Sequence, residues 1–395
     1  MNSIQMIHRE PPRQPHAAHP FGLEAARAAL AFHRSLPNYC ETPLISLSAL
    51  AGALGVASIH IKDESRRFDL NAFKVLGGSY CIARILAERF GLPSVDFIAL
   101  TQPELRAAIR EITFVTATDG NHGRGVAWTA NRLGSGCVVY LPKGSALERL
   151  ENIRGLGANA SITDMNYDDT VRFARAQARA NGWVMVQDTA WDGYTEIPTR
   201  IMQGYTTIGC EIAAQLGNIR PTHVFLQAGV GSMAGAMADF FMDLYSDAPP
   251  VITVVEPSNA DCIFRTAAAD DGRLHSVGGD LSTIMAGLAC GEPCSIGWKM
   301  LERSAQNYVS MPDYVAANGM RILGNPLGGD PRVISGESGA SAFGFAVEAL
   351  HNPELAGIRA QLRLNADSRL LCISTEGATD RENYRKIVWE GAYSR

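Results

Sequence analysis

Short apolar runs alternate with helix-like stretches along most of this 395-residue chain. The runs that predict strands cover residues 58–62, 113–117, 136–140, 159–163, 183–187, 223–228, 251–255 and 369–374. The stretches that predict helices cover residues 74–90, 122–133, 147–156, 167–180, 198–216, 233–243 and 338–350. Strands joined through helices usually pair in parallel, because the helix returns the chain to the same edge of the sheet. The pattern therefore predicts an α/β protein with mostly parallel strands.

The chain is longer than most single domains, so we expect two domains. Residues 87–200 contain strand and helix alternation of their own. We therefore expect a small domain of residues 87–200 inserted into a large domain made of residues 1–86 and 201–395. The first twenty residues are mostly polar, and we expect them to be poorly ordered.

Composition excludes several classes of protein. The net charge of −5 argues against a general nucleic-acid binder. No apolar run approaches the roughly 20 residues that span a membrane, and the N-terminal segment lacks the apolar core of a signal peptide, so we expect a cytoplasmic protein. The eight cysteines form no Cys-x-x-Cys pair, which argues against a zinc site. Whether Cys262 meets Cys290 or Cys294 stays open.

A lysine with unusual neighbours stands early in the chain. Lys74 lies between Phe73 and the small-residue turn Val75-Leu76-Gly77-Gly78. An apolar wall disfavours the charged form of a lysine and frees its amine as a nucleophile. Such an amine can form a Schiff base with an aldehyde cofactor. A plain surface lysine is the alternative when the pair is taken alone.

A second motif, residues 116–123, follows an apolar strand and opens a helix. Free backbone N–H groups at such a helix start can receive a carboxylate. Asn121 can bond a phenolic oxygen, and Asp119 brings a carboxylate to a place otherwise suited to anions. Taken alone, Asp119 is also a candidate helix cap.

The third motif, residues 227–235, is again a strand, a glycine turn and a helix. Its turn suits a phosphate, because backbone amides converge there at the positive end of a helix. The residues concerned are Gly229, Val230, Gly231, Ser232 and Met233. A dinucleotide loop is the competitor, with Ala234 at its last small position and Glu256 as the acid further on. A plain tight turn also stays open.

The fourth motif, residues 371–377, is a late strand that ends in hydroxyl side chains. Ser374 can bond a pyridine nitrogen without fixing a positive charge there, or it can cap the next turn. The four motifs together supply a lysine for an aldehyde, a seat for a phosphate and partners for a ring oxygen and a ring nitrogen. These are the requirements of pyridoxal phosphate.

The order of the motifs resembles that of the fold type II pyridoxal-phosphate enzymes, the group of threonine dehydratase and the tryptophan synthase β chain. Within this group the chain looks most similar to the 2,3-diaminopropionate ammonia-lyases. Residues 67–78, 117–128, 187–191 and 374–377 carry the likeness. Threonine dehydratases usually have Ser-Phe-Lys and Ser-Ser-Gly-Asn-His where this chain has Ala72-Phe73-Lys74 and Thr118-Asp119-Gly120-Asn121-His122.

The resemblance implies two three-layer αβα domains with mostly parallel twisted sheets, a homodimer and an amino-acid substrate. It also implies α,β-elimination of D- and L-2,3-diaminopropionate to pyruvate and ammonia. Lys74 holds the cofactor and, once freed, serves as the base for one enantiomer, while Asp119 serves the other. Asp188, and more weakly Tyr167, are candidates for holding the distal ammonium of the substrate, and a strand-end cap is the other interpretation of Asp188. Further candidate substrate contacts are Thr118, Gly120 and His122.

Two other functions stay open at this point. A serine or threonine dehydratase would use the same cofactor, but a β-hydroxyl substrate has no distal cation and gains little from a second acid at Asp119. A nicotinamide-binding dehydrogenase or regulator would use the turn at Gly229 and would leave Lys74 without a role.

Overall fold

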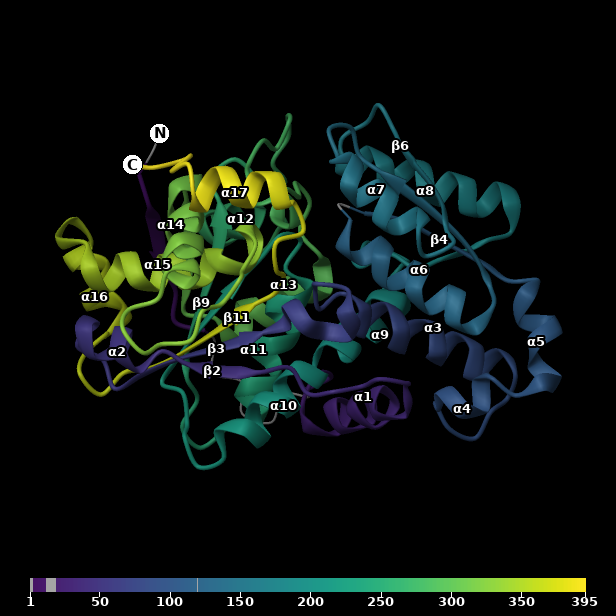
Figure 1. The fold of residues 1–395 in the computed structure, drawn as a ribbon, viewed down its shortest axis with the longest axis horizontal. Helices are drawn as coiled ribbons and strands as arrows, with labels where there is room; N and C mark the ends of the chain where they lie inside the picture. The colour runs from purple at the N-terminus through teal and green to yellow at the C-terminus, as the bar shows by residue number, and fades with distance from the viewer. Residues whose placement is uncertain (1–2, 12–18, 119) are drawn as a thin grey trace.

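The computed structural model describes residues 3–11, 19–118 and 120–395 and contains two sheets (Figure 1). The larger sheet has the strand order β1-β10-β9-β8-β11-β3-β2, and the smaller has the order β6-β5-β4-β7. All neighbours pair in parallel except the two edge strands of the larger sheet, β1 and β2, which are antiparallel. The chain is therefore an α/β protein with mostly parallel sheets.

The strands are β1 Gln5–His8, β2 Leu44–Ser46, β3 Ser58–Asp63, β4 Thr113–Ala117, β5 Gly136–Leu141, β6 Asn159–Ile162, β7 Val184–Met185, β8 His223–Gln227, β9 Val251–Pro257, β10 Asn307–Met311 and β11 Arg369–Ser374. The α-helices are α1 Leu23–Ser35, α2 Ser48–Leu54, α3 Val75–Arg89, α4 Phe97–Leu100, α5 Pro103–Arg110, α6 Asn121–Leu133, α7 Leu147–Arg154, α8 Tyr167–Asn181, α9 Glu196–Tyr205, α10 Thr207–Leu216, α11 Ser232–Leu244, α12 Cys262–Ala269, α13 Ser295–Ser304, α14 Asp313–Gly324, α15 Glu337–His351, α16 Ala356–Leu362 and α17 Arg381–Val388. Short 3-10 helices cover Glu64–Asp69 (η1), Ala286–Leu288 (η2) and Pro353–Leu355 (η3).

The larger sheet is buried on both faces. Every residue of β8 and β10 is buried, as expected for central strands of a sheet that helices cover on both sides. Helices α11 and α13 pack on each other, as do α14 and α15. The carboxyl ends of β8 and β11 lead into the third and fourth motifs, so the sheet brings these two distant segments to one edge.

The smaller sheet lies apart from the larger one, with α6, α7 and α8 around it (Figure 1). All four of its strands fall within residues 87–200, and all strands of the larger sheet fall outside that segment. Helix α3 packs on α6 and on α9, and so connects the two parts of the molecule.

The eight expected strands are present, with end points that differ by up to two residues. The expectation for residues 198–216 was wrong, because two helices replace the single one. The chain bends at Thr206, which ends α9 and precedes α10. The expectation of disorder in the first twenty residues was also wrong where β1 pairs with β10. None of the helices in the described ranges is long and apolar enough to cross a membrane.

The segment before Lys74 has an unusual backbone. Phe68, Asp69 and Asn71 have φ values of 49°, 59° and 59°, a region that residues other than glycine seldom adopt. Each such residue costs on the order of 1–3 kcal/mol unless the surroundings impose it. Tertiary contacts must therefore hold this segment.

One of these contacts is a backbone pairing with the segment that follows β11. The Phe73 amide donates to the Thr375 carbonyl at 3.1 Å, and the Gly377 amide donates to the Asn71 carbonyl at 3.0 Å. A Cβ on Gly377 would lie 2.1 Å from the Asn71 side-chain oxygen and 2.9 Å from Cβ of Ser65, so a larger residue there would displace both side chains. The pairing fixes the residue immediately before Lys74.

A buried ion network holds the other end of the same segment. Arg67 donates to both Glu64 and Glu211, and Lys62 donates to Glu211 at 2.7 Å. All four side chains are at most 1% exposed. Burial alone would raise the pKa of Glu211, but Arg67 and Lys62 outweigh burial and lower that pKa. The network balances two cations against two carboxylates, and this balance makes its burial tolerable.

We predict that Glu211→Ala destabilises the fold by about 3–5 kcal/mol, because it leaves Lys62 and Arg67 buried without their shared partner. Glu382→Ala removes an exposed pair with Lys386 and should hardly change stability. Urea unfolding of the two variants measures the difference. Equal midpoints for the two variants would contradict the role given to the network.

Candidate active site

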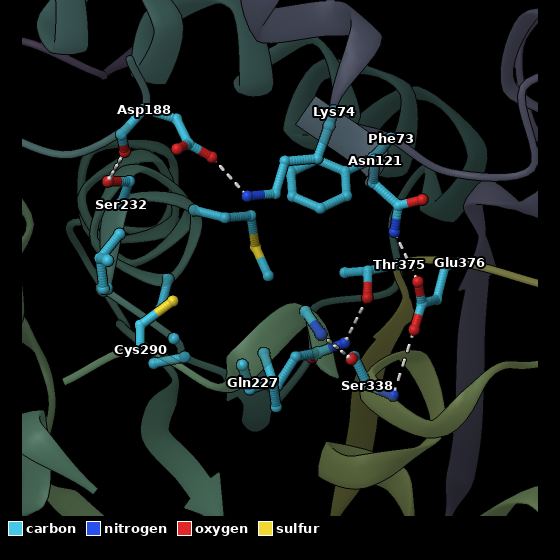
Figure 2. Close-up of a pocket in the computed structure, with 18 of the residues that line it drawn as sticks. Phe73, Lys74, Asn121, Asp188, Gln227, Ser232, Cys290, Ser338, Thr375 and Glu376 are labelled. Atoms are coloured by element: carbon cyan, nitrogen blue, oxygen red, sulfur yellow. Dashed lines mark hydrogen bonds and ion pairs between the residues drawn. The ribbon is translucent and has the colours of Figure 1, made fainter. Parts of the chain in front are cut away.

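A cavity lies where α3, α6 and the turn before α11 approach the end of β11 (Figure 2). Its lining consists of Phe73, Lys74, Asn121, Tyr167, Asp188, Tyr205, residues 227–234, Gly287, Leu288, Cys290, Ser338, Thr375 and Glu376. Members of all four sequence motifs therefore meet in one cavity.

Lys74 stands at the start of α3 and reaches into this cavity, where its ammonium pairs with Asp188 (Figure 2). The lysine side chain is 18% exposed and that of Asp188 is 3% exposed. Burial alone would raise the pKa of Asp188, but the charges of His122 and Lys74 outweigh burial and lower it to about 2. Asp188 is therefore a carboxylate at neutral pH, and it acts as a counter-charge to a cation.

The carboxylate of Asp188 is held by a polar network. The hydroxyl of Tyr167 and the amide of Gln187 each donate to Oδ1 of Asp188 at 3.3 Å. Nδ1 of His122 lies 3.9 Å from Oδ2, while its Nε2 bonds the Val186 carbonyl at 2.8 Å. These contacts orient Asp188 toward the cavity.

The glycine turn lies across the cavity from Asn121. Gly231 has φ = 90° and precedes α11, and no side-chain hydrogen bond caps this helix. Residues 229–234 all line the cavity. A helix start of this kind presents backbone N–H groups and a positive dipole end to an anion. The Ser232 hydroxyl donates to the Asp188 backbone carbonyl at 2.7 Å.

Two polar pairs close the opposite wall (Figure 2). Asn121 Nδ2 donates to Glu376 Oε2 at 2.5 Å, and Gln227 Nε2 donates to Thr375 Oγ1 at 3.0 Å. All four residues line the cavity. This wall therefore offers an amide and a hydroxyl to the edge of a polar ring.

The structure separates the expected site residues into two groups. Lys74, Asn121, Tyr167, Asp188 and the turn residues Gly229, Val230, Gly231, Ser232 and Met233 line the cavity. Thr118, Gly120, His122 and Ser374 are not among the lining residues. Asp119 lies outside the described residues.

The second group has structural contacts. Thr118 Oγ1 accepts bonds from the amides of Gly120 and Gly123 at 2.9 and 3.0 Å, which shapes the start of α6. Ser374 Oγ donates to Ser335 Oγ at 2.7 Å, away from the cavity lining. The next two residues along the chain, Thr375 and Glu376, line the cavity instead.

Several lining residues were not among the expected site residues. Glu376, Thr375 and Gln227 lie inside the third and fourth motifs. Their positions beside Ser374 and Gly229 in the sequence could have indicated that they belong to the site. Phe73 and Tyr205, whose ring centroids are 4.8 Å apart, form an apolar wall beside Lys74. Cys290 is also in the lining, and all eight cysteines, which lie in the described part of the chain, are free thiols.

The donor set fits a small aromatic aldehyde that carries a phosphate. Lys74 supplies the amine, the start of α11 supplies the anion seat, and Asn121 supplies the amide for a ring oxygen. Gly231 has a left-handed φ that favours glycine, and a Cβ on Gly229 would lie 3.2 Å from Cys290, Gly287 and Leu288, so both glycines are needed to form this tight turn.

Comparisons with known proteins agree with this site. A family model described as pyridoxal-phosphate dependent enzyme matches residues 36–360. The diaminopropionate ammonia-lyase of Escherichia coli (strain K12) is 51% identical over 377 residues, which cover 95% of this chain and 94% of the relative. The enzyme of that name from Salmonella typhimurium (strain LT2) is 51% identical over 368 residues, or 92% and 91% of the two chains.

A solved structure is also similar along its whole length. The crystal structure of the Escherichia coli diaminopropionate ammonia lyase in complex with an aminoacrylate-PLP azomethine reaction intermediate has a TM-score of 0.92 to this chain. The two are 46% identical, and the match covers 100% of this chain and 99% of that chain. The four motifs meet in one cavity, and half of the residues are identical to those of the Escherichia coli enzyme along nearly the full length of the chain. This chain therefore belongs to the diaminopropionate ammonia-lyases, a group of pyridoxal-phosphate dependent enzymes.

Proposed function

We propose that this protein catalyses the α,β-elimination of 2,3-diaminopropionate, in its D and L forms, to pyruvate and ammonia. The observation that carries the proposal is the Lys74–Asp188 pair, an amine and a carboxylate that face one cavity beside a glycine turn suited to a phosphate. Pyridoxal phosphate, when bound, supplies an electron sink for the charge left at Cα of the substrate. Lys74 would hold it through the amine, the turn at Gly229–Met233 through its phosphate, and Asn121 through its ring oxygen.

Different residues would then remove the Cα proton from the two enantiomers. Lys74, once freed, would take the Cα proton of the L form, and Asp119 would take that of the D form from the other side. Asp188, with a pKa of about 2, keeps its charge at working pH. It therefore suits the distal ammonium of the substrate and does not suit the role of acid, and Tyr167 supports it. An amine leaves readily only if it is protonated, and a distal group held by Asp188 as an ammonium already carries that proton.

Residues outside the cavity lining also have proposed roles. Thr118, Gly120 and His122 would place the substrate from the start of α6, and Ser374 would act on the ring nitrogen.

The division into a large domain of residues 1–86 and 201–395 and a small domain of residues 87–200 is supported by the separate sheets. A homodimer is proposed from the family resemblance, and a cytoplasmic location is supported by the free thiols.

The test is a comparison of substrates. Purified protein with pyridoxal phosphate should release one pyruvate and two ammonia molecules from each molecule of 2,3-diaminopropionate. Serine and threonine should react more slowly, because a β-hydroxyl has no cation for Asp188 to hold. Faster turnover of serine or threonine would make the chain a dehydratase instead.

We predict that Asp119→Asn lowers the rate with D-2,3-diaminopropionate by about 10²–10⁴-fold, the usual cost of losing a general base. The L form should lose less, because its proton faces Lys74. Steady-state pyruvate release from each pure enantiomer provides the measurement. Equal losses would place Asp119 at a step common to both forms, and no loss would leave it as a helix cap.

We predict that Gly231→Asp weakens pyridoxal phosphate binding on the order of a hundredfold beyond Gly231→Ala. Both variants strain the same left-handed backbone and place a Cβ 3.0 Å from Ile263, but only Asp adds a negative charge to the turn, which repels a phosphate held there by several kcal/mol. Titration of each apoenzyme with pyridoxal phosphate gives the two affinities. Equal affinities for the two variants would move the phosphate seat elsewhere.

A further inference from the structure

Glu376 is a buried acid in the cavity wall that the reaction as described does not use. It is 2% exposed and follows β11, in the segment that pairs with residues 71–73. Its Oε2 accepts from Asn121 Nδ2 at 2.5 Å, and its Oε1 accepts from the Ser338 amide at 3.3 Å (Figure 2). The Thr379 hydroxyl also donates to Oε2, at 3.4 Å. Both oxygens therefore receive hydrogen bonds, as those of a carboxylate do.

A second acid, Glu337, lies close enough to feel the charge of Glu376. Glu337 opens α15 and accepts a hydrogen bond from Asn383. Burial and the nearby charge of Glu376 raise the pKa of Glu337 to about 7. Of the two acids, Glu376 is the one whose oxygens accept three hydrogen bonds, from Asn121, Ser338 and Thr379.

A carboxylate only accepts hydrogen bonds, whereas the two ends of an asparagine amide differ, one donating and the other accepting. Glu376 therefore admits one orientation of Asn121, with Nδ2 turned toward it. The second hydrogen of Nδ2 stays available for an oxygen in the cavity. With the opposite orientation, two oxygens would face each other at Glu376.

We propose that Glu376 is a positioning residue, which holds the Asn121 amide so that its nitrogen donates to the ring oxygen of the cofactor. This inference rests on the proposed function, since it takes the cofactor to lie against Asn121. Glu376 acts through Asn121, 255 positions away along the chain.

The isosteric variant Glu376→Gln should reverse the orientation of the Asn121 amide. The Ser338 amide is a fixed backbone donor, so it selects the oxygen of the new glutamine. The glutamine nitrogen then faces Asn121 and draws the asparagine oxygen toward itself. The amide of Asn121 is inverted, and an oxygen faces the ring oxygen of the cofactor. A substitution that keeps size and shape should therefore harm cofactor binding.

A double-mutant cycle tests this inference. Apoenzymes of the wild type, Asn121→Ala, Glu376→Gln and the double variant are titrated with pyridoxal phosphate, and the visible absorption of the bound cofactor is recorded. Glu376→Gln should bind about tenfold or more weakly, the usual effect of losing a hydrogen bond to a charged group, and should change the visible spectrum. In the Asn121→Ala background the same substitution should change affinity less than about twofold, because the two residues act as one unit.

Glu337→Gln is the matched control, since it alters a buried glutamate beside Glu376 without a hydrogen bond to Asn121 in the structure, and its affinity should match that of the wild type. Additive losses in the cycle, or wild-type affinity and spectrum in Glu376→Gln, would overturn the inference. If Glu376→Gln does not fold, the same cycle with Glu376→Ala applies, with the same coupling expected. Failure of the wild-type apoenzyme to bind pyridoxal phosphate would instead overturn the proposed function.

Discussion

The site depends on a short backbone pairing between residues 71–73 and residues 375–377. This pairing imposes a backbone that Asn71 would not adopt alone, and it sets the start of α3. One side of it delivers Lys74 to the cavity, and the other side delivers Thr375 and Glu376. The reactive amine and the ring-facing wall are therefore placed by the same contact, and neither can shift without the other.

Charge is the second constraint. Burying an amine and several acids is costly unless each has a partner. The protein meets this cost twice, with Lys74 facing Asp188 in the cavity and with Lys62, Arg67, Glu64 and Glu211 below the segment that leads to it. The first pair is available to a ligand, because Lys74 is partly exposed and can exchange its partner. The second network is sealed and can only support the backbone.

Much of the fold could be predicted from the sequence, because buried parallel strands read as continuous apolar runs. Strand β10 was missed, since Asn307 and Ser310 interrupt its apolar pattern although both are buried. Strands β1 and β2 were missed because they are short edge strands. The break at Thr206 is marked only by Gly204, two residues earlier, and the apolar pattern continues across it, so residues 198–216 were predicted as one helix.

The site could be predicted where its parts are local. Lys74, Asn121 and the turn at Gly231 are each recognisable from a strand, a turn and a helix in sequence order. Pairs such as Asn121 with Glu376 and Lys74 with Asp188 join segments that only the tertiary fold brings together. Ser374 lies directly before this wall and its hydroxyl donates to Ser335 in the structure, so its contact with a ring nitrogen stays a prediction.

The central claim is that Lys74 is the residue that holds the cofactor. Borohydride reduction of the protein with pyridoxal phosphate, followed by proteolysis and mass measurement of the peptides, tests it directly. The account predicts one phosphopyridoxyl label, on the peptide that contains Lys74. A label on another lysine, or no label on a protein that turns over substrate, would contradict it.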